Sequence, residues 1–148
     1  MKSVMETSTR EEIINRINSL DDNHNAKWGK MDVFQMVKHC TLCDEMFLGR
    51  EKINRVFIGR LIGKSLLKKI LKDDKPFGMN APTAPALKTV GQSGDLEQQK
   101  KDWVSKVEQF GSYDNPEFIH PFFGAMTKEQ IGMFAYKHAD HHLRQFGA

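Results

Sequence analysis

Hydrophobic positions in this chain repeat with a helical period almost throughout, and no stretch alternates apolar and polar residues as a half-buried strand does. In the first such segment, for example, Ile13, Ile14, Ile17 and Leu20 form one apolar stripe. We therefore predict an all-α protein. Its four long helices are expected at about residues 9–20, 32–49, 95–110 and 127–146.

Local signals mark where these helices begin and end. Three of them start with a short polar residue followed by Glu or Gln, the capping-box pattern: Ser8 and Thr9 with Glu11 and Glu12, Asp32 with Gln35, and Thr127 with Gln130. The helix over 95–110 is expected to end at Gly111, because glycine is the preferred residue just beyond a helix.

The connection between the second and third long helices is unusually long. Its first part, 54–72, interleaves Ile and Leu with Arg and Lys and predicts an amphipathic helix with breaks at Gly59 and Gly63. Its second part, 73–94, carries Pro76, Pro82 and Pro85 and predicts an ordered loop. Four long helices with one long crossover are typical of a four-helix bundle, and we expect residues 1–148 to form one domain.

Composition narrows the function classes. The chain is 39% hydrophobic and 28% charged, as in ordinary globular proteins, and its net charge of +3 is too small to imply a polyanionic partner. No apolar run approaches the roughly 18 residues that span a bilayer, and residues 1–10 lack the apolar stretch of a signal peptide. Two cysteines, Cys40 and Cys43, suit a reducing compartment, so we expect a cytoplasmic protein.

Three of the six histidines occupy positions where spacing has chemical meaning. His138 and His142 lie four residues apart on the last predicted helix, so both imidazoles share one face of it. His39 lies about 10 Å along the second predicted helix. If these two helices are antiparallel, the three rings meet at one height and can bind one divalent metal ion with a coordination position left open.

Other residues are weaker candidates for the same site. His120 precedes the last helix and should lie near its far end, whereas His141 points about 100° away from His142. Cys43 lies one turn beyond His39 and could approach the ion. Gln35 and Gln145 are candidates for hydrogen bonding to the ligands. His141 and Tyr136 are candidates for a general base. Asp140 is not, because by helical phase it points away from His138 and His142.

Four segments together resemble a known superfamily. The segments WGKMDVFQMVKHC (28–40) and YKHADHHLRQFGA (136–148) resemble motifs of DinB-like (YfiT-like) proteins, in which a tryptophan precedes a metal-binding histidine and the last helix carries HxxxH. The segments KPFGMNAPTAPAL (75–87) and HPFFGAMTKEQIG (120–132) resemble a branch of that superfamily whose function is unknown. The resemblance extends from about residue 8 to the end of the chain.

This resemblance implies an up-down-down-up four-helix bundle that holds a metal through His39, His138 and His142. Characterised members include S-transferases that use low-molecular-weight thiols, and hydrolase- or isomerase-type enzymes. The chain departs from them in having Leu143-Arg144-Gln145 where Arg-Gly-Gln is usual. Their substrate-contacting residues cannot be matched here, so the resemblance carries over no reaction.

The leading hypothesis is a metal-dependent enzyme, a thiol-dependent S-transferase or a hydrolase, with Zn²⁺, Ni²⁺ or Fe²⁺ at the three histidines and a small-molecule substrate. The alternative is a non-catalytic metal- or ligand-binding module. The basic helix near 55–72 could also contact a membrane or nucleic acid, but we expect it to pack on the bundle with its lysines in solvent, without either partner. The same helix is a candidate surface for a homodimer.

Overall fold

The computed structural model describes residues 1–50, 52–79 and 83–148. Within these ranges the chain is mostly helical, as predicted, with one two-stranded antiparallel sheet. The elements are α1 (Thr7–Asn18), α2 (Val33–Phe47), α3 (Phe57–Ile70), α4 (Leu96–Gln109), α5 (Lys128–Phe146), β1 (Ile119–His120) and β2 (Gly124–Ala125), with short 3₁₀ turns η1 (Pro85–Leu87) and η2 (Phe110–Ser112).

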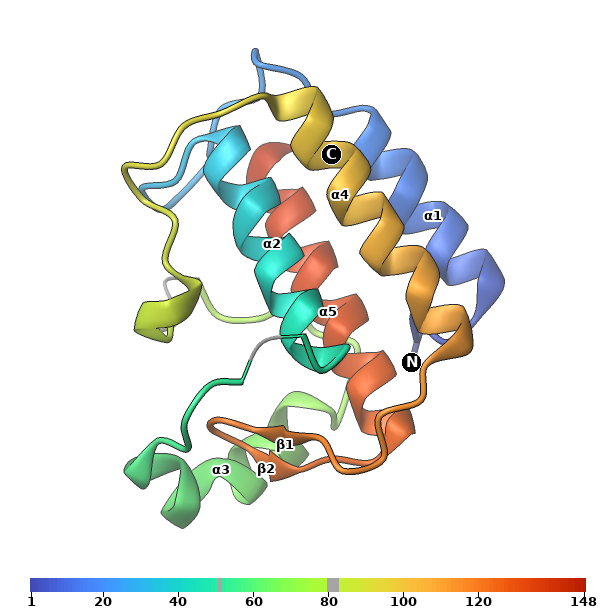
Figure 1. Ribbon diagram of the computed structural model, residues 1–148, viewed down its shortest axis with the longest axis vertical. Helices are drawn as coiled ribbons and strands as arrows, with labels where there is room; N and C mark the ends of the chain where they lie inside the picture. Colours follow the sequence, from blue (N-terminus) through green and yellow to red (C-terminus); the bar gives the residue numbers. More distant parts are fainter. Residues whose placement is uncertain (51, 80–82) are drawn as a thin grey trace.

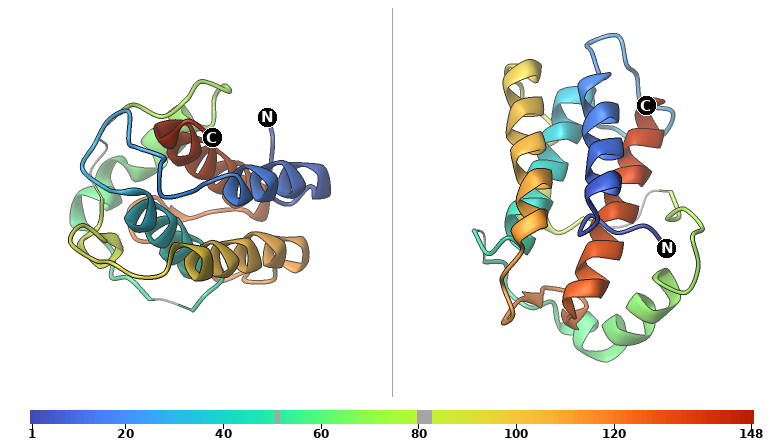
Figure 2. Two further views of the ribbon diagram at one scale, coloured as in Figure 1. Left: turned by 90° about the horizontal axis from the view of Figure 1, so that it is seen from above. Right: turned by 90° about the vertical axis from the view of Figure 1, so that its right-hand side faces the viewer.

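Four of the helices pack side by side, whereas α3 lies across one end of the group (Figures 1 and 2). Each of α2 and α1 contacts both α4 and α5. In Figure 1, α1 and α5 run toward the top of the view, and α2 and α4 run toward the bottom. The pair α2 and α5 is therefore antiparallel, which is the arrangement that a site shared by these two helices requires. No helix of the described ranges is long and apolar enough to cross a membrane.

The core consists of two clusters along this group of helices. One cluster, which includes Ile13, Met36, Trp103 and Leu143, joins α1, α2, α4 and α5. The other, which includes Phe47, Phe110, Phe123 and Ile131, extends to the segment of β1 and β2. Because α2 and α5 contribute to both clusters, their backbones are fixed on either side of His39 and of the His138–His142 pair.

Capping predictions for the two helices that carry the histidines are confirmed. Asp32 and Gln35 form a complete capping box at the start of α2, and Thr127 and Gln130 form one at the start of α5. The prediction for α1 was wrong, because this helix begins at Thr7 and its N-cap residue, Glu6, makes no side-chain capping bond. The preceding segment is held instead by Val4, whose side chain is buried and whose amide donates to Gly132.

The crossover helix α3 is continuous, so the predicted breaks at Gly59 and Gly63 were wrong. Both glycines face the backbone of Phe122, where an added Cβ would lie 2.3 Å and 2.2 Å from its carbonyl oxygen. They are therefore points of close helix packing rather than helix ends. Two further contacts fix α3 there: the Val56 amide donates to Pro121, and Lys64 Nζ donates to Ala125.

The long loop predicted over 73–94 follows α3. Its described parts contain one short turn, η1, and the prediction for residues 80–82, including Pro82, lies outside the described residues. Thr89 ties the later part of this loop to α2, because its buried hydroxyl donates to the Gln35 carbonyl at 2.7 Å. The loop is thus placed beside the middle of α2.

Replacing Gly63 with alanine shows whether helix propensity or the close contact with Phe122 has the larger effect on the stability of α3. Propensity alone would stabilise α3 by about 1 kcal/mol, but the contact with Phe122 leaves no room for a methyl group. We expect Gly63→Ala to loosen α3 and to accelerate tryptic cleavage at Lys64 and Lys68, measured by mass spectrometry. Ser65→Ala, at an exposed position of the same helix, is the control and should slow cleavage or leave it unchanged. Slower cleavage of Gly63→Ala would contradict the packing role.

Candidate metal centre

Three histidines from two antiparallel helices meet between α2 and α5. His39 comes from the middle of α2, and His138 and His142 come from successive turns of α5. One ring nitrogen from each lies within 4.8 Å of one from each of the others. Ring centroids are 5.1 Å apart for His39 and His138, 4.9 Å for His39 and His142, and 4.7 Å for His138 and His142. The structure thus brings together all three residues predicted as metal ligands.

The ring of His39 is oriented by the loop beside α2. Its Nδ1 lies 2.8 Å from the carbonyl oxygen of Leu87, which can only accept, so Nδ1 carries the proton. The neutral ring then has a free lone pair on Nε2. A metal-ligating histidine typically donates its other ring N–H to a carbonyl or carboxylate in this way.

His142 is oriented by a chain of two hydrogen bonds. Its Nδ1 lies 2.9 Å from the Gln145 amide oxygen, and the amide nitrogen of Gln145 donates to the Trp28 carbonyl at 2.6 Å. The second bond settles which end of the amide faces the histidine, so Nδ1 donates and Nε2 keeps its lone pair. Gly29 permits this approach, because its φ is +84° and an added Cβ would lie 2.7 Å from the Gln145 amide nitrogen.

His138 completes the cluster. Its Nε2 lies 3.2 Å from His39 Nε2. Two imidazole nitrogens on one tetrahedral ion are about 3.3 Å apart when each metal–nitrogen bond is ~2.0–2.1 Å. Without an ion, an N–H···N hydrogen bond accounts for the same distance. Taken over the whole residue, His138 is partly exposed, whereas His39 and His142 are buried.

The rings of the cluster favour the neutral form, which is the form that binds metal. Burial is the largest cause for each. It lowers the pKa of His39, and with the neighbouring His39 it lowers the pKa of His142 to about 3. The pKa of His138 is lowered well below its usual value by burial and by the adjacent His142 and His39. Uncharged rings on neighbouring turns avoid the repulsion that three imidazolium ions would suffer.

Cys43 lies beside the cluster but not within it. Its Sγ is 3.7 Å from His39 Nε2, but it does not belong to the group whose ligand atoms all lie within 4.8 Å of one another. Burial raises the pKa of the Cys43 thiol well above its usual value, so the sulfur is protonated. Because it lies outside that group, the Cys43 thiol is a packing neighbour of His39 rather than one of the three predicted ligands.

The remaining histidine candidates occupy two different places. His141 borders the cluster, with its ring edge-to-face with His142 and tilted against Trp28, at centroid distances of 5.0 Å and 5.5 Å. His120 lies outside the cluster, in an aromatic pocket where its Nδ1 accepts from the amides of Phe122 and Phe123. Burial and nearby Arg55 lower the pKa of His120 to about 4. The ring of His120 is therefore neutral, with its proton on Nε2.

Of the two glutamines expected to support the ligands, only Gln145 does so. Among the described residues, the side chain of Gln35 bonds to the Asp32 amide and the Gln92 carbonyl and not to a histidine. The sequence reasoning missed two carbonyl groups, those of Leu87 and Trp28, because backbone acceptors in loops leave no pattern in the residue types. Trp28 also has a buried indole N–H with no acceptor among the described residues.

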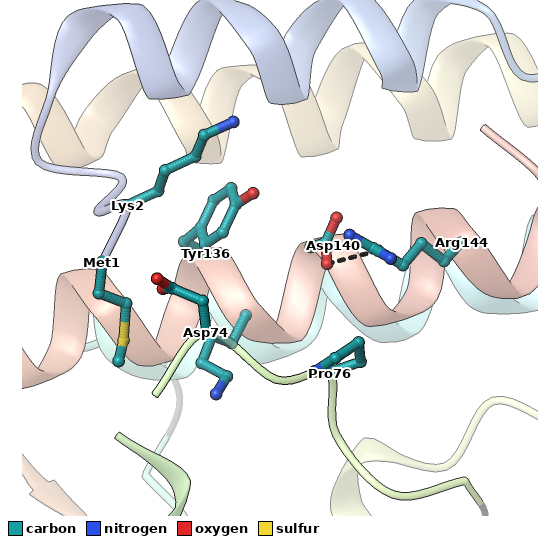
Figure 3. A pocket seen from close by; sticks show the side chains of 8 residues that line it. Met1, Lys2, Asp74, Pro76, Tyr136, Asp140 and Arg144 are labelled. Atoms are coloured by element: carbon teal, nitrogen blue, oxygen red, sulfur yellow. Dashed lines mark hydrogen bonds and ion pairs between the residues drawn. The ribbon is translucent and has the colours of Figure 1, made fainter. Parts of the chain in front are cut away.

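A surface pocket of about 280 Å³ lies on another face of α5 (Figure 3). Lys2, Asp74, Tyr136, Asp140 and Arg144 line it, and none of the three clustered histidines does. Asp140 is held there by Arg16 and Arg144, each with a nitrogen 2.8 Å from a carboxylate oxygen. Asp140 thus points away from the histidine cluster, as predicted from helical phase. Tyr136 lines the same pocket as Asp140.

Comparison with known proteins places the chain in a family without assigning an activity. No curated protein and no solved structure shows a significant match. The model of one family, described as a protein of unknown function (DUF1569), matches residues 2–148. The match spans α1 to α5 and therefore includes both helices that carry the histidine cluster. The chain accordingly belongs to the DUF1569 family.

Proposed function

We propose that this protein binds one divalent transition-metal ion through His39, His138 and His142 and acts as a metal-dependent enzyme. The observation that carries the proposal is the convergence of three ring nitrogens from α2 and α5 within 4.8 Å of one another. Two of these rings have their Nδ1 atoms engaged by Leu87 and Gln145, which leaves Nε2 of each for an ion.

The donor set indicates which ions fit. Neutral imidazoles suit Zn²⁺, Ni²⁺ and Fe²⁺, whereas Mg²⁺ and Ca²⁺ prefer oxygen ligands. Three protein ligands with a further position for water or substrate are typical of catalytic sites, and structural sites usually have four. The exclusion of Cys43 from the group supports the three-ligand arrangement.

A bound ion would supply Lewis-acid chemistry, lowering the pKa of a water or thiol to near neutrality. The chain's own groups have other tasks. His141, whose pKa is lowered chiefly by burial, stands beside the cluster as a neutral proton acceptor. The unpartnered indole N–H of Trp28, next to His141, is a donor for a polar group of a substrate.

We also propose that the family is a branch of the DinB-like superfamily and that the helical group is its up-down-down-up bundle. The directions of the four packed helices in Figure 1 support this assignment, and so does the chain order, in which α3 follows α2 and precedes α4. We propose a reaction of the thiol-dependent S-transferase or hydrolase type on a small molecule, because these activities occur among characterised members of that superfamily, although none of their substrate contacts can be matched in this chain. A low-molecular-weight thiol with a panel of electrophiles is the first substrate screen.

A structural metal site is the second candidate function. The burial of His39 and His142 between two packed helices favours it, because an ion there would also cross-link α2 and α5. Removing the metal with a chelator distinguishes the catalytic role from the structural role. In both cases the ion stabilises the fold in proportion to its binding free energy, and for the enzyme we expect turnover to be lost as well. A large fall in melting temperature without any metal-dependent turnover would favour the structural role.

Removing the two α5 ligands tests the binding itself. We expect His138→Ala/His142→Ala to lose the metal that the untagged protein carries, measured by elemental analysis, because one imidazole cannot hold the ion. His24→Ala, in the loop after α1, is the matched control and should retain one ion per chain. Stoichiometric metal in the double variant would refute the assignment.

A substitution at Gln145 tests whether its hydrogen bond to His142 contributes to the affinity for the metal ion. We expect Gln145→Met to weaken metal binding by roughly 10–100-fold, because His142 loses the acceptor that fixes its tautomer. Gln99→Met is the control, since Gln99 makes a comparable side-chain bond to Thr41 away from the cluster. Competition with a chromogenic chelator measures both affinities. Equal losses in the two variants would show that Gln145 acts only through general stability.

A further inference from the structure

The positive charge of this protein is concentrated around α3. Residues 52–72 contain seven Lys and Arg and no Asp or Glu. The whole chain has 22 basic and 19 acidic residues, so the remainder has 15 against 19 and a net charge of −4. The overall charge of +3 therefore conceals one strongly basic segment on an otherwise acidic chain.

The first two turns of α3 expose four large apolar side chains beside Arg60 and Lys64. Phe57 is 75% exposed, Leu61 67%, Ile58 48% and Ile62 47%. The opposite face carries Gly59, Gly63 and Leu67, which are buried against the rest of the protein. These large side chains are exposed because two glycines, not the apolar residues, form the packing face.

We propose that α3 docks this protein onto a membrane surface that contains anionic lipid. Lys68, Lys69 and Lys72 follow the apolar turns and are exposed. An interfacial helix combines bulky apolar side chains, which enter the boundary between headgroups and acyl chains, with cations that attract anionic headgroups. Both features are present on the solvent side of α3, which lies at one edge of the molecule (Figure 1).

The charge pattern favours lipid over a second copy or nucleic acid. Two copies joined symmetrically through α3 would bring two segments of charge +7 together without an acidic residue between them. Nucleic acid would attract the cations but would leave Leu61, Ile58 and Ile62 in water, since aliphatic side chains offer no stacking surface. An anionic bilayer would accommodate the exposed apolar side chains of α3 and would also attract its lysines.

Packing against the rest of the protein holds α3 in its helical form before it meets a membrane. The helix is already formed and is held by the close contact of Gly59 and Gly63 with Phe122. Docking therefore needs no folding of the segment, unlike an amphipathic peptide that becomes helical only on the bilayer. Lys64 donates to Ala125 and belongs to this anchoring, so the test variants leave it unchanged.

Vesicle co-sedimentation of the whole 148-residue chain tests the proposal. We expect binding to vesicles of phosphatidylglycerol and phosphatidylcholine in equal parts, weak binding to pure phosphatidylcholine, and release as ionic strength rises from about 0.05 M to about 0.5 M. Replacing Lys68, Lys69 and Lys72 with Gln should weaken partitioning by roughly a hundredfold. Phe57→Ser/Leu61→Ser should weaken it by roughly tenfold or more.

Matched variants elsewhere control for charge and hydrophobicity. Lys27, Lys30 and Lys101 are exposed and lie outside the basic segment, so changing all three to Gln should have little effect. Val90→Ser removes an exposed apolar side chain away from α3 and should also leave binding unchanged. Circular dichroism of each variant confirms that the fold is retained.

Three results would overturn the proposal. The first is equal binding, or none, to anionic and neutral vesicles. The second is a dimer in sedimentation velocity without lipid that Phe57→Ser/Leu61→Ser dissociates, which would assign the face to a second copy. The third is binding to nucleic acid that the lysine variant loses and the serine variant keeps, in the absence of vesicle binding.

Discussion

The candidate metal centre depends on two hydrogen bonds that fix which nitrogen of each ring carries the proton. Leu87 accepts from Nδ1 of His39, and Gln145 accepts from Nδ1 of His142. With these protons placed, both Nε2 lone pairs are free while burial keeps the rings uncharged. If either acceptor moved, a ring could rotate or change tautomer, and the three-nitrogen arrangement would lose a donor.

One of these acceptors comes from a loop and the other from α5 itself. Leu87 belongs to the long connection after α3, which Thr89 ties to α2, and Gln145 is held by the carbonyl of Trp28 in the connection before α2. Two loops far apart in sequence are thus anchored against the same pair of helices. Helix packing sets the height of the rings, and the loops set their orientation.

Much of this arrangement follows from the sequence because helical spacing is regular. The positions of His138 and His142 on one face, the level of His39 and the contact of Gln145 all come from the period of the helix. Gln35 lies one turn before His39 but is committed to the capping box with Asp32, so spacing alone misplaced it. The carbonyl of Leu87 could not be predicted, because any residue type provides one. Gly59 and Gly63 were predicted as breaks because close packing against Phe122 is invisible until the fold is known.

X-ray absorption spectroscopy of the metal-loaded protein tests the central claim most directly, because it counts the atoms bound to the ion. The account predicts three imidazole nitrogens at about 2.0–2.1 Å, at most one or two further light atoms, and no sulfur. A sulfur neighbour at about 2.3 Å would make Cys43 a ligand, and fewer than three imidazoles would show that the histidines do not share one ion. Either result would contradict the three-histidine site.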